Sequence, residues 1–264
     1  MNQPFTHLIL ISVLALLSTF CLQAQPAKNG NADLSTFDPE KDDAVYLSGT
    51  WEFYWNRLLE PADFNVDQPS TFIEVPGSWH RQGKFAKLGY ATYRLRILLP
   101  PDHHGLSIYL PVVNSTAKVW LNGKLLHETG KVSTDPEIYE ARLISTLIPV
   151  PEKIREAELI VQVANYNYFS GGLVGTPQID HASEIFSRIN RINGIENFFA
   201  GSLIAMFIYQ LILYFLYHRG KPYLWLALIC LGVALRSLIV HGGSYLLPNL
   251  FPGVSGAKVT VEDS

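Results

Sequence analysis

Two short runs of polar and aromatic residues are the strongest candidates for chemistry in this sequence. Each combines an aromatic ring with planar polar groups: Trp79, His80 and Arg81, and Asn165, Tyr166 and Asn167. An aromatic face stacks on the apolar surface of a sugar ring, and planar polar groups bind its hydroxyls. We therefore expect these residues to bind a carbohydrate-like or other small ligand. Ordinary turn chemistry or edge packing is the alternative for each residue.

No set of residues forms a recognisable catalytic or metal site. Glycosidases need two carboxylates that flank the scissile bond, and Glu52, Glu74 and Glu128 are interpreted as solvated strand or loop positions. His103 and His104 are adjacent, so on a strand they would point to opposite faces and would not hold one metal together. The sequence therefore predicts no enzyme, no metal and no cofactor.

Charge and cysteine content exclude further classes of protein. The formal net charge is -3 and no long basic run occurs, so nucleic acid is not an expected partner. The two cysteines, Cys21 and Cys230, both lie in apolar segments. This placement excludes a disulfide framework and a thiolate metal cluster in the polar middle of the chain.

The middle of the chain, residues 47–180, alternates apolar and polar side chains with the period of a β-strand. Several such stretches separated by turns predict an all-β sandwich. Trp51, Phe53 and Tyr93 are expected in its core. The preceding residues, 25–46, are expected to form a flexible N-terminal segment.

Two turns organise this region. Asn122 and Gly123 both tolerate positive φ, which predicts a two-residue hairpin loop of the primed type. Pro76 and Gly77 are expected to end a strand and to expose Trp79 and the residues after it. Because strand ends in a sandwich converge, both candidate sets can share one rim.

Three hydrophobic segments flank the sandwich. Residues 1–24 resemble a signal peptide in length and flanks, with a buried helix as the alternative. Residues 198–217 carry no charge and 223–242 carry only Arg236, so both are predicted membrane spans. Arg236 is expected to snorkel to the interface, with pairing inside a helix bundle as the alternative. The short loop 218–222 makes the two spans a helical hairpin, and residues 243–264 are expected to follow as a periplasmic tail that is polar from Gly253 to Ser264.

A juxtamembrane helix is predicted for residues 181–197. Its apolar residues recur at helical spacing, and either Asp180 or Ser183 could cap it. The apolar stripe either packs on the sandwich or on lipid, or makes a rod that transmits strain to the membrane. Export by the signal peptide would place the sandwich outside and the loop 218–222 in the cytoplasm, as the positive-inside rule prefers for Arg219 and Lys221.

Several motifs in order resemble a known domain. They are Gly49-Thr-Trp-Glu-Phe-Tyr-Trp55, Val75-Pro-Gly-Ser-Trp79, Gly89-Tyr-Ala-Thr-Tyr-Arg94, Val119-Trp-Leu-Asn-Gly-Lys124 and Asn165-Tyr-Asn-Tyr-Phe-Ser-Gly-Gly172. The first four resemble the jelly-roll sugar-binding domain of family 2 glycoside hydrolases. Followed by hydrophobic helices, the set resembles bacterial seven-transmembrane receptors with diverse intracellular signalling modules.

The resemblance implies a periplasmic, galactose-binding-like domain in the bacterial inner membrane, with a carbohydrate-like ligand and a cytoplasmic histidine kinase or cyclase output. Members have seven spans, whereas this chain shows two, so it is expected to be a truncated gene product, a fragment, or a protein whose remaining parts were lost. We expect the extracytoplasmic sensor portion of a signalling receptor. A membrane-tethered carbohydrate-binding protein without signalling output is the alternative, and a structural anchor that binds another protein is a weaker one.

Overall fold

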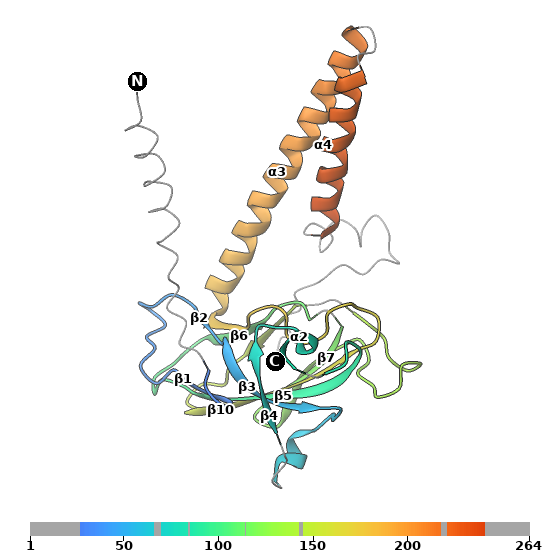
Figure 1. Ribbon diagram of the computed structural model, residues 1–264. Helices are drawn as coiled ribbons and strands as arrows, with labels where there is room; N and C mark the ends of the chain where they lie inside the picture. Colours follow the sequence, from blue (N-terminus) through green and yellow to red (C-terminus); the bar gives the residue numbers. More distant parts are fainter. Residues whose placement is uncertain are drawn as a thin grey trace, which may run out of the picture.

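The computed structural model describes residues 27–65, 70–83, 85–113, 115–142, 145–217 and 221–240. The predicted signal peptide, residues 1–24, and the predicted tail, residues 243–264, lie outside the described residues. So do residues 218–220 of the predicted cytoplasmic loop. The described part consists of two β-sheets packed on one core and a long helical hairpin that projects from them (Figure 1).

The larger sheet runs, in spatial order, through β4 (Thr71–Val75), β3 (Gly49–Trp55), β5 (Gly89–Leu98), β10 (Glu156–Asn165), β7 (Thr116–Leu121) and β8 (Lys124–Thr129). Each of these strands is antiparallel to its neighbours. A short strand, β1 (Asn31–Asp33), runs parallel to the last residues of β5, where Asn31 lies opposite Arg96. The smaller sheet has the order β2 (Val45–Tyr46), β11 (Gln178–His181), β6 (Leu106–Leu110) and β9 (Thr146–Pro149), also antiparallel.

The inward faces of the two sheets share one hydrophobic core. Trp51, Phe53 and Tyr93 of the larger sheet are fully buried there, together with Ile108 and Ile179 of the smaller one. This confirms the predicted core residues. Period-two alternation places every second side chain on this face, so the two sheets bury their apolar rows against each other.

The loop after β3 covers part of the outer face of the larger sheet. It contains the short 3-10 helix η1 (Pro61–Asn65). The Thr92 hydroxyl donates to the Arg57 carbonyl at 2.8 Å and accepts the Leu59 amide at 2.9 Å, and the Gln162 amide donates to the Leu59 carbonyl at 3.0 Å. These bonds fix the loop on the sheet.

Residues 27–46 belong to the folded domain, so the predicted flexible segment is wrong over this stretch. Ala27, Ala32 and Leu34 are buried in the core, and the strands β1 and β2 join one sheet each. The sequence pattern is hard to recognise because β1 and β2 have only three and two residues, too few to show an alternation.

The turn at Asn122 and Gly123 is confirmed. Their φ angles are 49° and 81°, and Leu121 pairs with Lys124 across the loop. The Asn122 side chain has a second structural role, since its Oδ1 accepts the Glu158 backbone amide at 2.7 Å. The hairpin is thereby tied to β10, the central strand of the larger sheet.

The predicted juxtamembrane helix and first span form one continuous helix, α3 (Ala182–Leu216). It begins directly after β11, with His181 at the N-cap rather than Asp180 or Ser183, and no side chain caps it. At 1.5 Å per residue, a helix of this length extends about 50 Å. Helix α4 (Lys221–Val240) packs back against the distal part of α3 (Figure 1).

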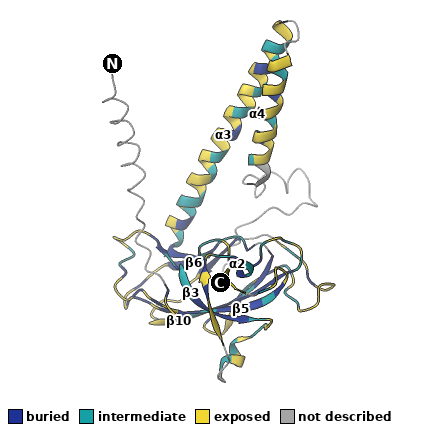
Figure 2. Cartoon of the chain, viewed as in Figure 1, coloured by how far each residue is buried: buried dark blue, intermediate teal, exposed yellow. Residues whose placement is uncertain are grey.

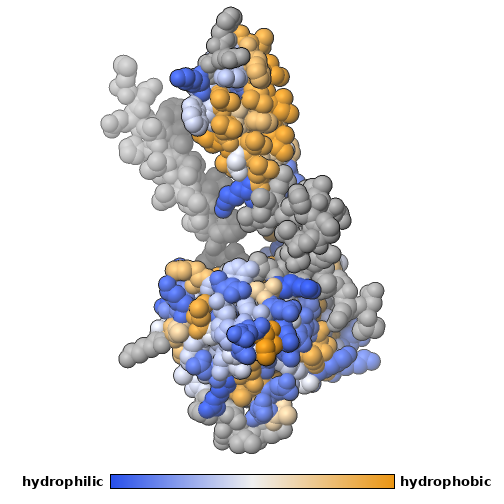
Figure 3. All heavy atoms as spheres, turned by 90° about the vertical axis from the view of Figure 1, so that its right-hand side faces the viewer, coloured by the Kyte–Doolittle hydropathy of each residue, from blue (hydrophilic) through white to orange (hydrophobic). Residues whose placement is uncertain are grey.

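The hairpin carries an exposed apolar surface. Phe198 and Phe215 are both 72% exposed, and Trp225 and Ile229 are also exposed. Figure 2 shows exposed positions along both helices, and Figure 3 shows the hairpin as mostly hydrophobic above a largely hydrophilic domain. Within the described residues, one helix, α3, is long and apolar enough by length and composition to cross a membrane.

Candidate functional site

The two predicted candidate runs lie on loops that meet. The first loop, residues 76–88, follows β4, and the second, residues 166–177, follows β10. The Gly77 amide donates to the Leu173 carbonyl at 2.7 Å, the Ser78 hydroxyl donates to the Gly171 carbonyl at 3.0 Å, and the Trp79 amide donates to the same carbonyl at 3.2 Å. The expected convergence on one rim is therefore confirmed. We refer to these two loops together as the rim.

Trp79 is buried in the rim, so its expected exposure is wrong. Its exposed fraction is 0%, and its ring makes an edge contact with Trp55 at 5.2 Å between centroids. The short helix α2 (Trp79–Gln82) turns the indole inward at its first residue, where the aromatic cluster around Phe53 can cover it. The indole Nε1 donates to the Lys87 carbonyl at 3.3 Å. Trp79 thus supports the loop and is not available as a ligand platform.

Asn165 has a similar supporting role. It is fully buried, its Oδ1 accepts the Tyr168 amide and its Nδ2 donates to the Tyr168 carbonyl, each at 2.9 Å. The same Nδ2 donates to the Lys87 carbonyl at 3.3 Å. Because every polar atom of the amide has a partner, Asn165 holds the second loop in shape and links it to the first.

His80 and Arg81 lie at the surface of the rim. The His80 Nδ1 and the Ser78 hydroxyl form a hydrogen bond of 2.6 Å, and the imidazole is half-buried. Arg81 is exposed, and its backbone amide donates to the Ser78 carbonyl at 3.1 Å. Both side chains can therefore reach a ligand.

Tyr166 and Asn167 lie where a third loop, residues 131–142, joins the second. The Tyr166 hydroxyl donates to the Thr134 carbonyl at 2.8 Å, and its ring makes an edge contact with Tyr139 at 5.2 Å. Burial raises the pKa of both hydroxyls, so both remain protonated donors at neutral pH. Asn167 is exposed.

Phe169 and Lys87 complete the rim, although neither is among the residues predicted from sequence. Phe169 is 67% exposed, the Lys87 Nζ lies 4.1 Å from its ring centroid, and the His80 ring lies 5.8 Å away, edge to face. The run of aromatic residues around Phe169 was the available signal, but alternation along a loop does not show which ring is exposed. The exposed ring can stack on a sugar, and the basic groups around it can donate hydrogen bonds.

Glu52, one of the acidic residues of the β-domain, belongs to a cluster of ion pairs and hydrogen bonds. Glu52 is buried, which corrects its interpretation as a solvated position: it accepts a hydrogen bond from Tyr54 at 2.8 Å and from Arg94 at 3.4 Å. Arg94 also pairs with Glu158, and its guanidinium lies 4.4 Å from the centroid of Phe64. These groups neutralise one another on the outer face of the larger sheet.

His103, the buried residue of the His103–His104 pair, has a structural role. The two ring nitrogens of His103 lie 2.9 Å from the Pro100 carbonyl and 3.1 Å from the Pro151 carbonyl, whereas His104 faces Glu152 at the surface. No group of three or more metal-ligating side chains occurs among the described residues.

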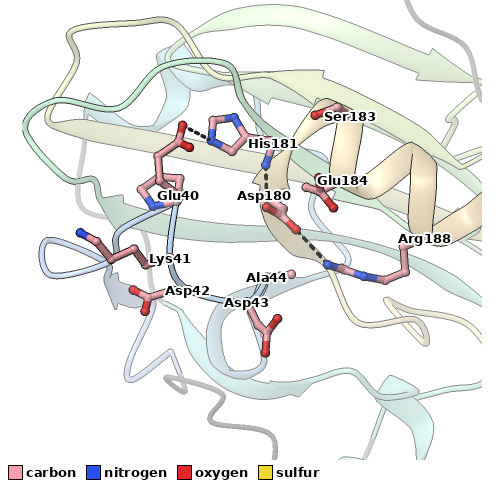
Figure 4. A pocket seen from close by; sticks show the side chains of 11 residues that line it. Glu40, Lys41, Asp42, Asp43, Ala44, Asp180, His181, Ser183, Glu184 and Arg188 are labelled. Atoms are coloured by element: carbon pink, nitrogen blue, oxygen red, sulfur yellow. Dashed lines mark hydrogen bonds and ion pairs between the residues drawn. The ribbon is translucent and has the colours of Figure 1, made fainter.

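A pocket of about 400 Å³ lies at the base of α3, away from the rim. Figure 4 shows Glu40 pointing to His181, and Asp180 to Arg188. The distances are 3.6 Å from Glu40 Oε1 to His181 Nε2 and 2.9 Å from Asp180 Oδ2 to Arg188 Nη2. Because residues 39–44, the end of β11 and the first turns of α3 line this pocket, we describe it as the joint between the sheets and the helix.

Comparison with known proteins gives matches in the solved structures. A family 2 β-galacturonidase from Eisenbergiella tayi bound to galacturonate aligns with 17% identity over 53% of this chain and 24% of its own, with a TM-score of 0.36. The β-glucuronidase of Ruminococcus gnavus aligns with 14% identity over 55% of this chain and 30% of its own, with a TM-score of 0.40. The chain thus spans less than a third of each enzyme. No family model and no curated protein matches the sequence.

The fold and the rim together define a class of molecule. It has two mostly antiparallel sheets with a shared core, a rim of loops at one end of the strands, and one long apolar helix that continues from the smaller sheet.

Proposed function

We propose that this chain is the extracytoplasmic sensor portion of a bacterial transmembrane signalling receptor. Its β-domain, a galactose-binding-like jelly roll, binds a carbohydrate-like or other small ligand at the rim. Helices α3 and α4 lie in the inner membrane, with the β-domain in the periplasm after removal of a signal peptide. In an intact receptor the output would be a cytoplasmic kinase or cyclase, and the chain itself has no catalytic role.

The observation that carries this proposal is the direct, well-anchored continuity of the β-domain with α3. No linker separates β11, which ends at His181, from α3, which starts at Ala182. The side chain of Arg188 donates to Gln178 and to Asp180, each at 2.9 Å, and Ile185 is fully buried at the same joint. A change in the smaller sheet therefore has a rigid path into the helix, as coupling between two states requires.

The surface of the hairpin supports a membrane environment. Large apolar side chains that are more than half exposed are costly in water when they cover a continuous surface. Residues 198–217 carry no charge, and a helix of that extent matches a hydrocarbon layer about 30 Å thick. The joint lies outside this stretch, so ion pairs such as Asp180 with Arg188 remain in an aqueous environment.

The test uses the full chain in detergent micelles. A thermal-shift screen of sugars and small metabolites first identifies a ligand that raises the melting temperature. Hydrogen exchange of residues 182–192 is then measured with and without that ligand. We expect binding at the rim to change protection at the joint. Stabilisation without any change at the joint would favour the membrane-tethered carbohydrate-binding protein, and stabilisation only by a protein partner would favour an anchor.

A further inference from the structure

The first and second loops of the rim lack acidic residues, although the chain as a whole has a net charge of -3. No acidic residue occurs from Val75 to Pro101 or from Leu159 to Ile179, the two stretches that contain the first and second loops. The first loop contributes His80, Arg81 and Lys87. Glu74 in β4 directly precedes the first of these stretches, Asp180 directly follows the second and pairs with Arg188, and Asp135 of the third loop lies near Tyr166. The end of the rim around Phe169 is therefore basic.

The basic side chains at this end have no carboxylate partner in the part of the chain that the structure describes. Elsewhere in the β-domain, Arg94 and Lys118 each pair with a glutamate. In contrast, the contacts of Lys87 and His80 are with the ring of Phe169 and, for His80, with Ser78. An unpaired Lys87 ammonium beside an exposed aromatic ring is suited to bind a ligand that has both an apolar face and a negative charge.

The rim is also pre-organised. The Lys87 carbonyl accepts bonds from both Trp79 and Asn165, and the Asn165 amide fixes Tyr168, the neighbour of Phe169. An added Cβ at Gly171 would lie 2.3 Å from Trp79 and 2.8 Å from Asn165, so the loops are packed closely beneath the surface. Buried residues thus fix the backbone at Lys87 and next to Phe169 before any ligand arrives, which lowers the entropic cost of binding.

We propose that the rim selects acidic sugars, with the ring of Phe169 stacked on the apolar face of the sugar and the Lys87 ammonium, assisted by His80 and Arg81, bound to its carboxylate. This inference rests on the proposed function, because it names the ligand class for the same rim. The Lys87 ammonium lies 4.1 Å from the ring centroid at the end of a long, exposed side chain, so it can move from the ring to the carboxylate of a sugar that stacks there. A sulfate ester presents the same anionic chemistry, and the experiment distinguishes it from a carboxylate.

The test is calorimetric titration of the full chain in detergent micelles with three probes. They are a trimer of galacturonic acid, its methyl ester, in which each carboxylate is neutralised, and a sulfated trimer of galactose. We expect the acid to bind about tenfold more tightly than the ester, with the difference reduced at high salt. If the sulfated trimer binds as tightly as the acid, the rim selects anionic sugars in general. If the sulfated trimer binds more weakly than the acid, the selection is restricted to carboxylates.

Substitutions locate the binding. Lys87→Ala should reduce the affinity for the acid to that for the ester, and Lys87→Arg should retain the preference. Phe169→Ala should lower the affinity for both the acid and the ester about tenfold, whereas Phe169→Tyr should leave both affinities unchanged. Lys124→Ala, at an exposed position on the β7–β8 hairpin, is the matched control and should leave both affinities unchanged. Since Lys87 and Phe169 have exposed side chains, circular dichroism should show that each variant folds.

The outcomes separate the two proposals. Equal affinity for acid and ester, both lost in Phe169→Ala, would overturn acid selection and leave the carbohydrate site intact. Binding that is unaffected by Phe169→Ala would overturn the location at the rim. Absence of binding by the probes and by a wider panel of neutral and acidic glycans would overturn the carbohydrate function itself.

Discussion

Arg94 shows how single residues hold the β-domain together. Its side chain is 13% exposed and lies between Glu52 and Glu158, over the ring of Phe64. Burial opposes its charge, but the hydrogen-bonded Glu158 carboxylate offsets this and raises the pKa of the guanidinium. The outer face of the larger sheet therefore contains a compensated cluster, in which each charge depends on its neighbours.

Removing Arg94 should be strongly destabilising. Arg94→Ala leaves the buried Glu52 without its closest cation, and we expect the free energy of unfolding to fall by about 2 to 3 kcal/mol. Chemical denaturation of the chain in micelles, followed by tryptophan fluorescence, measures the change. Arg96→Ala is the matched control: Arg96 is 49% exposed and reaches Glu52 at 3.6 Å, so it should cost no more than about 0.5 kcal/mol. Equal losses in the two variants would contradict the cluster.

Gly171 offers a second test at this scale. Gly171→Ala places a methyl group against Trp79 and Asn165, and overpacking of this kind costs about 1 to 3 kcal/mol. The variant should unfold earlier and should lose ligand affinity in parallel, because the rim must shift. Gly194→Ala, where nothing lies within 4 Å of the new Cβ, should be neutral or slightly stabilising. A Gly171→Ala variant as stable as the unaltered chain would contradict the close packing of the rim.

The sequence indicated which loops meet at the rim, the candidate site, but not which of their side chains are exposed. The polar runs after β4 and β10 do form one rim, because convergence of strand ends follows from the sandwich itself. Trp79 and Asn165 looked like ligand residues and are buried supports, whereas the exposed ring is Phe169. Local patterns identify residues capable of chemistry, but which of them face solvent depends on how two loops distant in sequence pack together.

At the scale of elements, the strands with strong period-two alternation could be predicted from the sequence, whereas the shortest strands could not. The alternation in β3, β5 and β10 predicted the core, and Asn122 with Gly123 predicted the hairpin, because each signal is local. The strands β1 and β2 depend on pairing with distant residues, so nothing local reveals them. The single helix α3 was predicted as two elements because its composition changes along its length while its backbone does not.

Loss of the Arg188 side chain should weaken the attachment of α3 to β11. Arg188→Ala removes both anchoring bonds and leaves the buried Asp180 unpaired, so the first turns of α3 should open more readily. We expect hydrogen exchange of residues 182–190 to accelerate about tenfold or more, with little effect on β5 and β10. Arg191→Ala, one turn further along on an exposed position, is the control. Unchanged exchange in Arg188→Ala would mean that the ion pair does not fix the helix.

At the scale of the whole molecule, two surfaces of opposite character are joined by one helix. The β-domain buries its apolar residues between two sheets, and the hairpin exposes them along both helices (Figure 3). The segment 182–197 of α3 carries charged residues such as Glu184 and Arg191, whereas 198–217 carries none. In the proposed receptor, this boundary would divide a water-exposed part of α3 from a lipid-exposed part.

Impermeant thiol labelling tests this arrangement directly. In a chain with Cys21→Ser and Cys230→Ala, the variants Lys124→Cys and Lys221→Cys place single thiols on the β-domain and at the start of α4, both at exposed positions. If 198–217 crosses the membrane once, these positions lie on opposite sides. We expect a charged maleimide added to spheroplasts to label Lys124→Cys at once and Lys221→Cys only after lysis. Labelling of both variants before lysis would show that the hairpin does not span the bilayer, and the reverse pattern would place the β-domain in the cytoplasm, where the proposed sensing of external sugars is impossible.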